Sequence, residues 1–139
     1  MTLVVDTSVV IKWAVKEPGT DEASQLVDRS LIAPDLLQAE VANVLTKKVR
    51  GRELSAEQAR LAFRQILSRI SLLPSAPFGN AAFDLSLSLG HSVYDCYFLA
   101  VAEAHGPFMV TADTIFAAKV RASNRAPLVY LLGEEIPDD

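Results

Sequence analysis

The sequence predicts an α/β domain: a three-layer α/β/α sandwich with a central parallel sheet of four to five strands. Two observations predict this fold class. Short apolar runs alternate with helical patterns along the chain, and that alternation implies parallel strands joined by right-handed crossovers, with helices on both sheet faces. The chain has 139 residues, half of them hydrophobic, which suits one well-buried core. We therefore expect a single domain over residues 1–139.

Five short apolar runs bounded by turn residues are predicted as strands. They are the apolar residues 3–5, SLIAPD at 30–35, ISLLP at 70–74, PFMVTAD at 107–113 and PLVYLL at 127–132. The first and fourth runs share a theme, because hydroxyl and carboxylate side chains follow each of them. In an open parallel sheet, sites form at the carboxyl ends of the strands, where the strand order reverses.

Apolar residues at helical spacing predict helices between the strands. The first follows Asp6 and ends at Trp13, before the break at VKEPGT, and the others cover about residues 21–29, 36–50, 55–69, 80–89, 91–105 and 114–123. We expect Thr20 to cap the second helix, and Ser55 to start the fourth with a capping box that Gln58 completes. The stretch SAPFGN is predicted to be a loop.

Cysteine content and hydropathy limit the class of protein. Cys96 is the only cysteine, which excludes an internal disulfide framework and a multi-cysteine zinc site and fits a reducing compartment. We expect it to be a small buried hydrophobe. No apolar run approaches the ~20 residues that cross a bilayer, and the first residues lack a signal-peptide pattern. A soluble, cytoplasmic protein without membrane contact is expected.

Charge is distributed unevenly along the chain. The net charge of −4 argues against a nucleic-acid partner, yet residues 44–83 carry seven basic residues against two acidic ones, a local balance of +5. The basic residues are Lys47, Lys48, Arg50, Arg52, Arg60, Arg64 and Arg69. Two interpretations stay open, namely a solvated helical surface and contact with phosphate groups.

Four carboxylates are candidates for chemistry. Asp6 and Asp113 each end a predicted strand, so they can be neighbours at one sheet edge. Asp95, in the first turn of its helix, and Glu40 both lie on apolar margins of helices that face the core. Each also has a structural explanation, because Asp6 or Thr7 can cap the next helix and Asp95 can complement a helix dipole.

A shared cavity accounts for all four acids at once. Two carboxylates about 4 Å apart repel by about 4 kcal/mol at an effective dielectric near 20, so the cluster must take up protons or bind a cation. Oxygen ligands suit Mg²⁺ or Mn²⁺. Zinc fits less well, because His91 and His105 have no ligand-like spacing to each other or to Cys96. We interpret His91 as a loop residue and His105 as a favourable charge near a helix C-terminus.

Metal held by carboxylates in an α/β domain indicates phosphodiester chemistry, in which the ion polarises the phosphate and activates water. No rival nucleophile is apparent. Ser8 and Ser92 have no histidine in an arrangement that the sequence can establish, and Gly-rich phosphate loops and Gly-x-Ser-x-Gly elbows do not occur.

With these residues in place, the chain resembles the PIN-domain ribonucleases, and among them the VapC-type toxins of bacterial and archaeal toxin–antitoxin pairs. The resemblance covers nearly the whole length and rests on four motifs in order: VVDTSVVIKW, APDLLQAEVANVL, GHSVYDCYFLAVAE and VTAD. It implies a PIN-like fold and a Mg²⁺- or Mn²⁺-dependent endoribonuclease acting on RNA. The family pattern carries over to Asp6, Glu40, Asp95 and Asp113 as metal-binding, catalytic acids. Supporting residues are Thr7 or Ser8, Thr111 and Asn43.

The resemblance also implies partners, namely a second copy of the chain in a homodimer and a small inhibitory antitoxin. The antitoxin would lay an apolar segment into a groove and direct a basic side chain at the acids. The helices around Leu45 and Phe63 are a candidate groove, although core packing explains those residues equally well.

Three alternatives remain to be distinguished. One is a PIN-fold RNA-processing nuclease without an antitoxin, and another is an inert PIN-fold binding module, against which the four intact acids argue. The third is an aspartyl-phosphate enzyme or acceptor domain, which would need a second acid two residues after the strand-end Asp, where this chain has Ser8.

Overall fold

The computed structural model describes residues 1–125 and 128–138. Within these residues, five strands form one sheet in the order β3-β2-β1-β4-β5, and every neighbouring pair is parallel. The strands are β1 (Thr2–Val5), β2 (Ser30–Pro34), β3 (Ser71–Leu73), β4 (Phe108–Thr111) and β5 (Val129–Leu131). The predicted parallel sheet is confirmed. Pro127, which begins the last predicted strand, lies outside the described residues.

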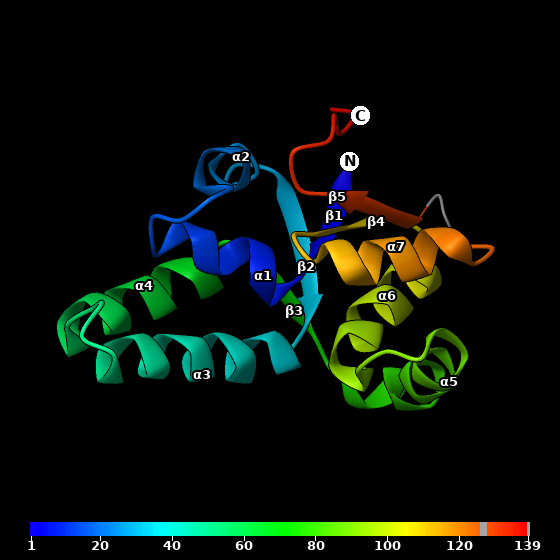
Figure 1. Ribbon diagram of the computed structural model, residues 1–139, viewed down its shortest axis with the longest axis horizontal. Coiled ribbons are helices and arrows are strands. Elements are labelled where there is room, and N and C mark those ends of the chain that lie inside the picture. The colour runs from blue at the N-terminus through cyan, green and yellow to red at the C-terminus, as the bar shows by residue number, and fades with distance from the viewer. Residues whose placement is uncertain (126–127, 139) are drawn as a thin grey trace.

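The helices follow the predicted order along the chain (Figure 1). They are α1 (Thr7–Val10) with a 3-10 turn, η1 (Ile11–Trp13), then α2 (Thr20–Ser24), α3 (Leu36–Arg50), α4 (Ala56–Ser68), α5 (Gly79–Leu89), α6 (Val93–His105) and α7 (Thr114–Ala122). Another 3-10 turn, η2 (Ala76–Phe78), lies in the stretch predicted as a loop.

The helices form two layers around the sheet. Figure 1 shows α1 to α4 on the left of the strands and α5 to α7 on the right. Helix α6 packs across β1, β2 and β4, with α5 against its outer side, while α3 and α4 pack together as a helical hairpin. The three-layer α/β/α sandwich is therefore confirmed. The strand order reverses at β1 and β4, so their carboxyl ends form the switch point where sites are expected.

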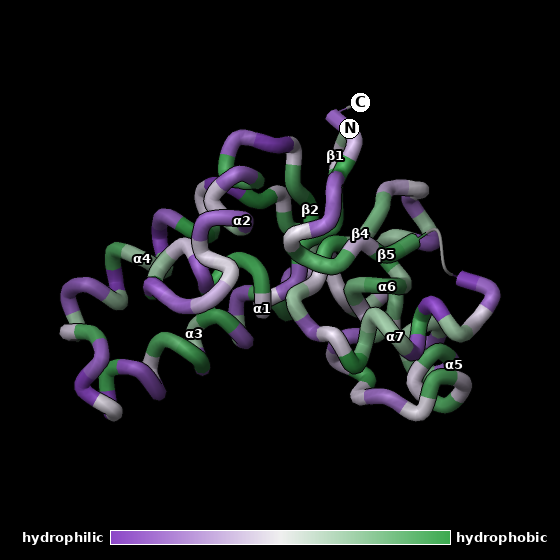
Figure 2. The backbone as a smooth tube through the Cα atoms, turned by 45° about the horizontal axis from the view of Figure 1, so that its top comes forward, coloured by the Kyte–Doolittle hydropathy of each residue, from purple (hydrophilic) through white to green (hydrophobic). Residues whose placement is uncertain are grey.

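The core lies along the central strands and α6, where the tube in Figure 2 is most hydrophobic. Leu3, Val4 and Val5 of β1 are fully buried, as are Phe98 and Leu99 of α6. Strands buried on both faces read as continuous apolar runs, which is why β1 and β4 were recognisable in the sequence. Cys96 is also buried in this core, and burial raises the pKa of its thiol to about 11, as expected for a packing residue.

Helix ends test the capping predictions. Ser55 Oγ accepts from the Gln58 backbone N–H at 3.0 Å and Gln58 Oε1 accepts from the Ser55 N–H at 2.9 Å, so the capping box is confirmed. The prediction for Thr20 is wrong. Its hydroxyl accepts from the Glu17 N–H and donates to the Val15 carbonyl, closing the preceding loop, and the helix ends at Ser24 rather than near residue 29.

None of the helices within residues 1–125 and 128–138 combines the length and apolar character that crossing a membrane requires.

Burial predicts different responses of two phenylalanines. Phe98→Ala should lower the free energy of unfolding by about 3–5 kcal/mol, because the side chain is 0% exposed in the core beneath the sheet. Phe83→Ala on α5 is the matched control: its side chain is 60% exposed, and the change should stay within about 0.5 kcal/mol. Urea unfolding followed by circular dichroism measures both. Equal losses would contradict the placement of α6 as the central helix.

Candidate functional site

Asp6 follows β1 and lies at the base of the site. It is only 2% exposed, and both of its carboxylate oxygens accept hydrogen bonds from hydroxyl groups. Ser8 Oγ donates to Oδ1 at 2.5 Å, and Thr111 Oγ1, from the end of β4, donates to Oδ2 at 2.6 Å. The carboxylate makes no capping hydrogen bond to α1. Asp6 nevertheless occupies the N-cap position of α1, and the Val9 backbone lowers the pKa of its carboxyl slightly, so the capping alternative applies to its position while the Ser8 and Thr111 hydroxyls hold its carboxylate.

Asp113 follows β4, the strand that pairs with β1. Its Oδ1 accepts from the Phe116 N–H at 3.0 Å, so it is the N-cap of α7. The Asp113 N–H in turn donates to Thr111 Oγ1 at 3.1 Å, and the Ala112 N–H donates to Ser8 Oγ at 3.0 Å. These bonds tie the segments after β1 and β4 together, so Asp6 and Asp113 lie at the same sheet edge, as predicted.

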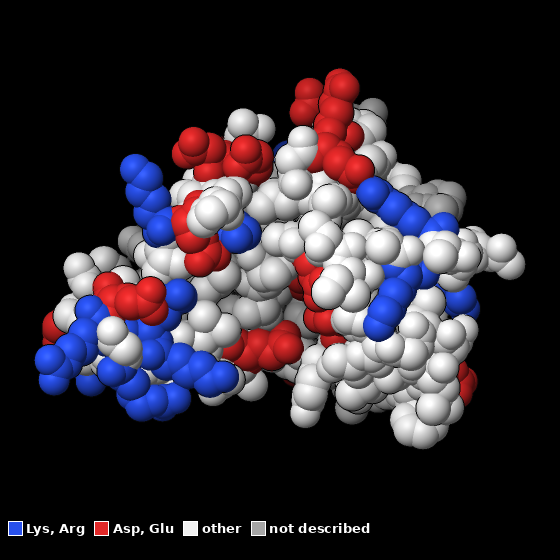
Figure 3. All heavy atoms as spheres, viewed as in Figure 1, with Lys and Arg blue, Asp and Glu red and all other residues white. Residues whose placement is uncertain are grey.

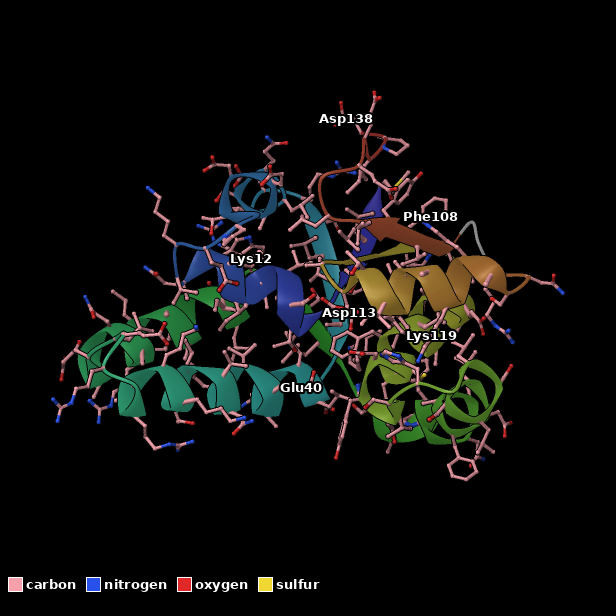
Figure 4. All side chains as sticks on the ribbon, in the orientation of Figure 1. Lys12, Glu40, Phe108, Asp113, Lys119 and Asp138 are labelled. Carbon is pink, nitrogen blue, oxygen red and sulfur yellow. The ribbon has the colours of Figure 1, made fainter. Side chains whose placement is uncertain are left out.

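Glu40 reaches the site from α3, on the opposite side of the sheet from α6. Its side chain is partly buried, and Oε1 accepts from Thr7 Oγ1 at 2.8 Å. Figure 4 shows Glu40 and Asp113 projecting toward the same space from α3 and from the start of α7. The apolar stripe of α3 buries Leu37 and Val41 on either side of Glu40, which explains why this acid lies against the core.

Asp95 lies in the first turn of α6 and has a nitrogen partner. His91 Nε2 lies 2.6 Å from Asp95 Oδ2 and 4.0 Å from Asp113 Oδ2. One potential ligand atom from each of these three residues falls within 4.8 Å of the other two. The site therefore contains an imidazole beside its carboxylates, and Figure 3 shows separate acidic patches beside the hollow at the centre of the view.

Burial and like charge act on the same acids. Burial is the main factor that raises the pKa of Asp6 from 3.8 to about 7; the Ser8 and Thr111 hydroxyls oppose the rise, and the charge of Asp95 adds to it. Burial also raises the pKa of Glu40, again opposed by its hydroxyl partner, Thr7, and assisted by Asp95. Asp95 thus lies close enough to influence acids from β1 and from α3.

The structure brings together most of the residues that the sequence singled out. The four acids, Asp6, Glu40, Asp95 and Asp113, lie at this end of the sheet with three hydroxyl partners, Thr7, Ser8 and Thr111. Among the described residues, the group whose ligand atoms lie within 4.8 Å of one another contains Asp95 and Asp113 with His91, but not Asp6 or Glu40. Asn43 is exposed one helical turn beyond Glu40, and its side chain takes no part in the hydrogen bonds of this site. Carboxylate oxygens with a single imidazole are donors that suit Mg²⁺ or Mn²⁺, so the residues present fit a divalent ion.

His91 is the site residue that sequence reasoning missed. It lies in the predicted loop, but its side chain turns back onto the first turn of α6. The spacing of four residues between His91 and Asp95 was the available signal, because residues i and i+4 lie on the same face of a helical turn. The spacing of His91 to His105 and Cys96 gives no sign of this acidic neighbour.

Asp35 shows that a strand-end acid need not join the site. It follows β2, yet its Oδ1 accepts from both the N–H (3.0 Å) and the hydroxyl (2.6 Å) of Ser75, near the end of β3. Both hydrogen bonds of this carboxylate join the end of β2 to the end of β3, so its function is structural.

The fold and the site together define a class of protein. It is a parallel α/β domain with four acidic residues near the switch point of its sheet, where carboxylate oxygens could bind a cation. The sequence model of the PIN domain family matches residues 3–121, which is most of the chain. The protein belongs to the PIN domain family, as its motifs indicated.

Individual relatives agree with this assignment. The chain is similar to Ribonuclease VapC3 of Pyrobaculum aerophilum, with 32% identity over 88% of this chain and 97% of that protein. In fold it resembles PAE2754 from Pyrobaculum aerophilum, with a TM-score of 0.70 and 23% identity over 93% of this chain and 83% of that one. It also resembles a chain of a toxin–antitoxin complex from Klebsiella pneumoniae, with a TM-score of 0.69 and 19% identity over 96% and 99% of the two chains.

The raised pKa of Asp6 predicts how stability depends on pH without divalent ions. Between its ordinary value of 3.8 and about 7, the folded protein keeps a proton that the unfolded chain releases. Protonation therefore stabilises the fold at low pH, and this contribution falls by about 4 kcal/mol as the pH rises through that range. Asp6→Asn, which cannot titrate, should lack this fall in urea unfolding measured in EDTA.

The control for that experiment is Asp84→Asn, which changes an exposed carboxylate on α5. Its unfolding free energy should follow the wild-type pH dependence. If the Asp6→Asn curve also runs parallel to wild type from acid to neutral pH, the buried environment of Asp6 is contradicted.

Proposed function

We propose that this protein is a metal-dependent endoribonuclease that hydrolyses RNA phosphodiester bonds and acts as the toxin of a type II toxin–antitoxin system. The observation that carries the proposal is the gathering of four acids at the carboxyl ends of β1 and β4. The relative from Pyrobaculum aerophilum is named a ribonuclease, and the similar Klebsiella pneumoniae structure is a toxin–antitoxin complex, which supports both parts. RNA as the substrate is consistent with action in the cytoplasm.

In this proposal Asp6, Glu40, Asp95 and Asp113 hold Mg²⁺, or Mn²⁺, at the sheet edge. When bound, the ion polarises the scissile phosphate and lowers the pKa of a water molecule. The chain supplies orientation. Thr7, Ser8 and Thr111 fix the carboxylates that they contact, and Asn43 is a candidate contact for the substrate or the ion, as the family resemblance implies.

Asp6 has a particular need for a cation. Its pKa of about 7 means that the buried carboxyl holds a proton over part of the neutral range. Asp6 would release this proton on holding a divalent ion, because a nearby cation would favour the charged form of the carboxyl group.

Cleavage tests the proposal directly. Purified protein, freed from any bound partner, should cut structured RNA with Mg²⁺ or Mn²⁺ and should be inactive in EDTA. Asp6→Asn and Asp95→Asn should each lower the cleavage rate by about 100-fold or more, because each removes a charge that holds the ion. Circular dichroism should show that both variants remain folded.

The matched control is Asp84→Asn, the same chemical change on an exposed acid of α5. It should cleave RNA at the wild-type rate. Cleavage by Asp6→Asn and Asp95→Asn at the wild-type rate would overturn the site assignment, and cleavage unaffected by EDTA would overturn the metal dependence.

The antitoxin is expected to bind the α3–α4 hairpin. A groove of about 400 Å³ runs between these helices, with a floor that includes Leu45, Val49 and Phe63 and with Arg50 and Arg60 among its lining residues. Phe63 is only partly buried, so core packing leaves part of its ring available, which favours the groove interpretation of this position. An amphipathic segment could bury its apolar side chains here.

Filling this groove should separate antitoxin binding from catalysis. Thr46→Trp places a large ring in the groove from an exposed position on α3, and should weaken binding of the antitoxin by about tenfold or more. Calorimetry with the product of an adjacent short reading frame measures the affinity. Thr46→Val is the matched control and should bind normally.

Both Thr46 variants should cleave RNA at the wild-type rate, because Thr46 lies more than one turn beyond Glu40 on α3. Unchanged antitoxin affinity in Thr46→Trp would contradict this docking site. Absence of any such partner would favour the RNA-processing alternative.

Two further parts of the proposal concern surfaces away from the acids. Most of the basic residues gather at the outer end of the α3–α4 hairpin, away from the carboxylates (Figure 3), whereas Arg69 lies at the other end of α4, beside Asp28. A solvated surface and phosphate contact are the two alternatives for this outer cluster. A homodimer is proposed from the family resemblance.

A further inference from the structure

His91 is held more firmly than its place in a loop suggests. Its backbone N–H donates to the Ser86 carbonyl at 3.3 Å, and its carbonyl accepts from Ser86 Oγ at 2.5 Å. Gly90 before it adopts φ 61°, which favours glycine and turns the chain from α5 toward α6. The imidazole packs on Phe116 with ring centroids 4.7 Å apart, and its side chain is 11% exposed.

Lys119 and Asp95 together determine which ring nitrogen of His91 carries the proton. Its Nζ donates to the Gly90 carbonyl at 2.8 Å and lies 3.4 Å from His91 Nδ1; Figure 4 labels it on α7, on the side of α6. An ammonium group has donors and no acceptor, so Nδ1 faces it with a lone pair. The proton of the neutral ring is then on Nε2, which points at Asp95 Oδ2 at 2.6 Å.

We propose that His91 is a positioning residue of the carboxylate site. Lys119 fixes the tautomer in which His91 Nε2–H donates to Asp95 Oδ2, and this bond orients Asp95 with Oδ1 left to meet the cation. The inference rests on the proposed function, because it assigns His91 a role toward the metal ion. Among the described side chains, His91 is the hydrogen-bond donor that reaches Asp95.

The same geometry disfavours His91 as a direct ligand. Coordination through Nε2 needs its lone pair, which would move the ring proton to Nδ1, opposite the Lys119 ammonium. The two roles make different predictions about metal choice. A nitrogen ligand favours Mn²⁺ over Mg²⁺, whereas orienting an oxygen ligand affects the affinity for both ions to a similar degree.

The first measurement is the tautomer of the unsubstituted ring. His105→Gln changes an exposed histidine at the end of α6 and leaves His91 as the only histidine. In ¹⁵N NMR without metal, at a pH where the ring is neutral, Nε2 should appear as the protonated nitrogen. In Lys119→Met, which removes the ammonium group, the fraction of rings with the proton on Nδ1 should rise, although the Asp95 carboxylate still favours a proton on Nε2. A proton on Nδ1 in the presence of Lys119 would overturn the proposal.

The second measurement is the affinity for Mg²⁺ and Mn²⁺ by calorimetry. His91→Leu keeps an apolar side chain against Phe116 but removes the donor, and should lower both affinities by a similar factor, about 10–100-fold. His91→Gln keeps an N–H donor and should recover much of the loss. His105→Gln is the matched control and should bind both ions like wild type.

Each remaining outcome is decisive. Wild-type affinities in His91→Leu would show that Asp95 needs no support. A loss confined to Mn²⁺, with ¹⁴N hyperfine coupling to bound Mn²⁺ in the wild type, would make His91 a ligand and overturn the positioning role. If Asp95→Asn abolishes ion binding while His91→Leu does not, only this inference fails; if wild type binds neither ion, the proposed metal-dependent function fails.

Discussion

The burial of the Asp6 carboxylate is the constraint on which the rest of the site depends. A buried acid must be neutral, or its charge must be compensated by hydrogen bonds or a cation. One of its two hydroxyl partners, Ser8, is close in sequence, but the other, Thr111, comes from β4. The parallel pairing of β1 with β4 therefore has to place Thr111 correctly, and a shift in strand register would leave one oxygen without its donor.

The acids also join the two helical layers. Glu40 comes from α3 and Asp95 from α6, which lie on opposite sides of the sheet in Figure 1. Their like charges oppose this convergence, as the upward effect of Asp95 on the pKa of Glu40 shows. Packing of the apolar stripes on both helices holds the acids together despite this repulsion. Such arrangements, in which packing maintains unfavourable electrostatics, are typical of functional sites.

Much of this arrangement could be predicted because the signals are local. Continuous apolar runs identify strands buried on both faces, and the acids directly after β1 and β4 then follow from the geometry of parallel sheets. The role of Asp35 could not be predicted in this way, because it resembles Asp6 in sequence and differs only through Ser75, which is 40 residues away. His91 was missed for a related reason, since its orientation depends on the turn at Gly90 and on α7.

The Thr7–Glu40 hydrogen bond has a mechanical consequence. Helix α3 has 15 residues and is therefore about 22 Å long, with Glu40 near its first turn and the groove along its outer half. Thr7 tethers the inner end of this rod to the segment after β1. Because the tethered residue is Glu40 itself, this bond resists a load on the exposed outer half of the hairpin and keeps the carboxylate beside the segment that follows β1.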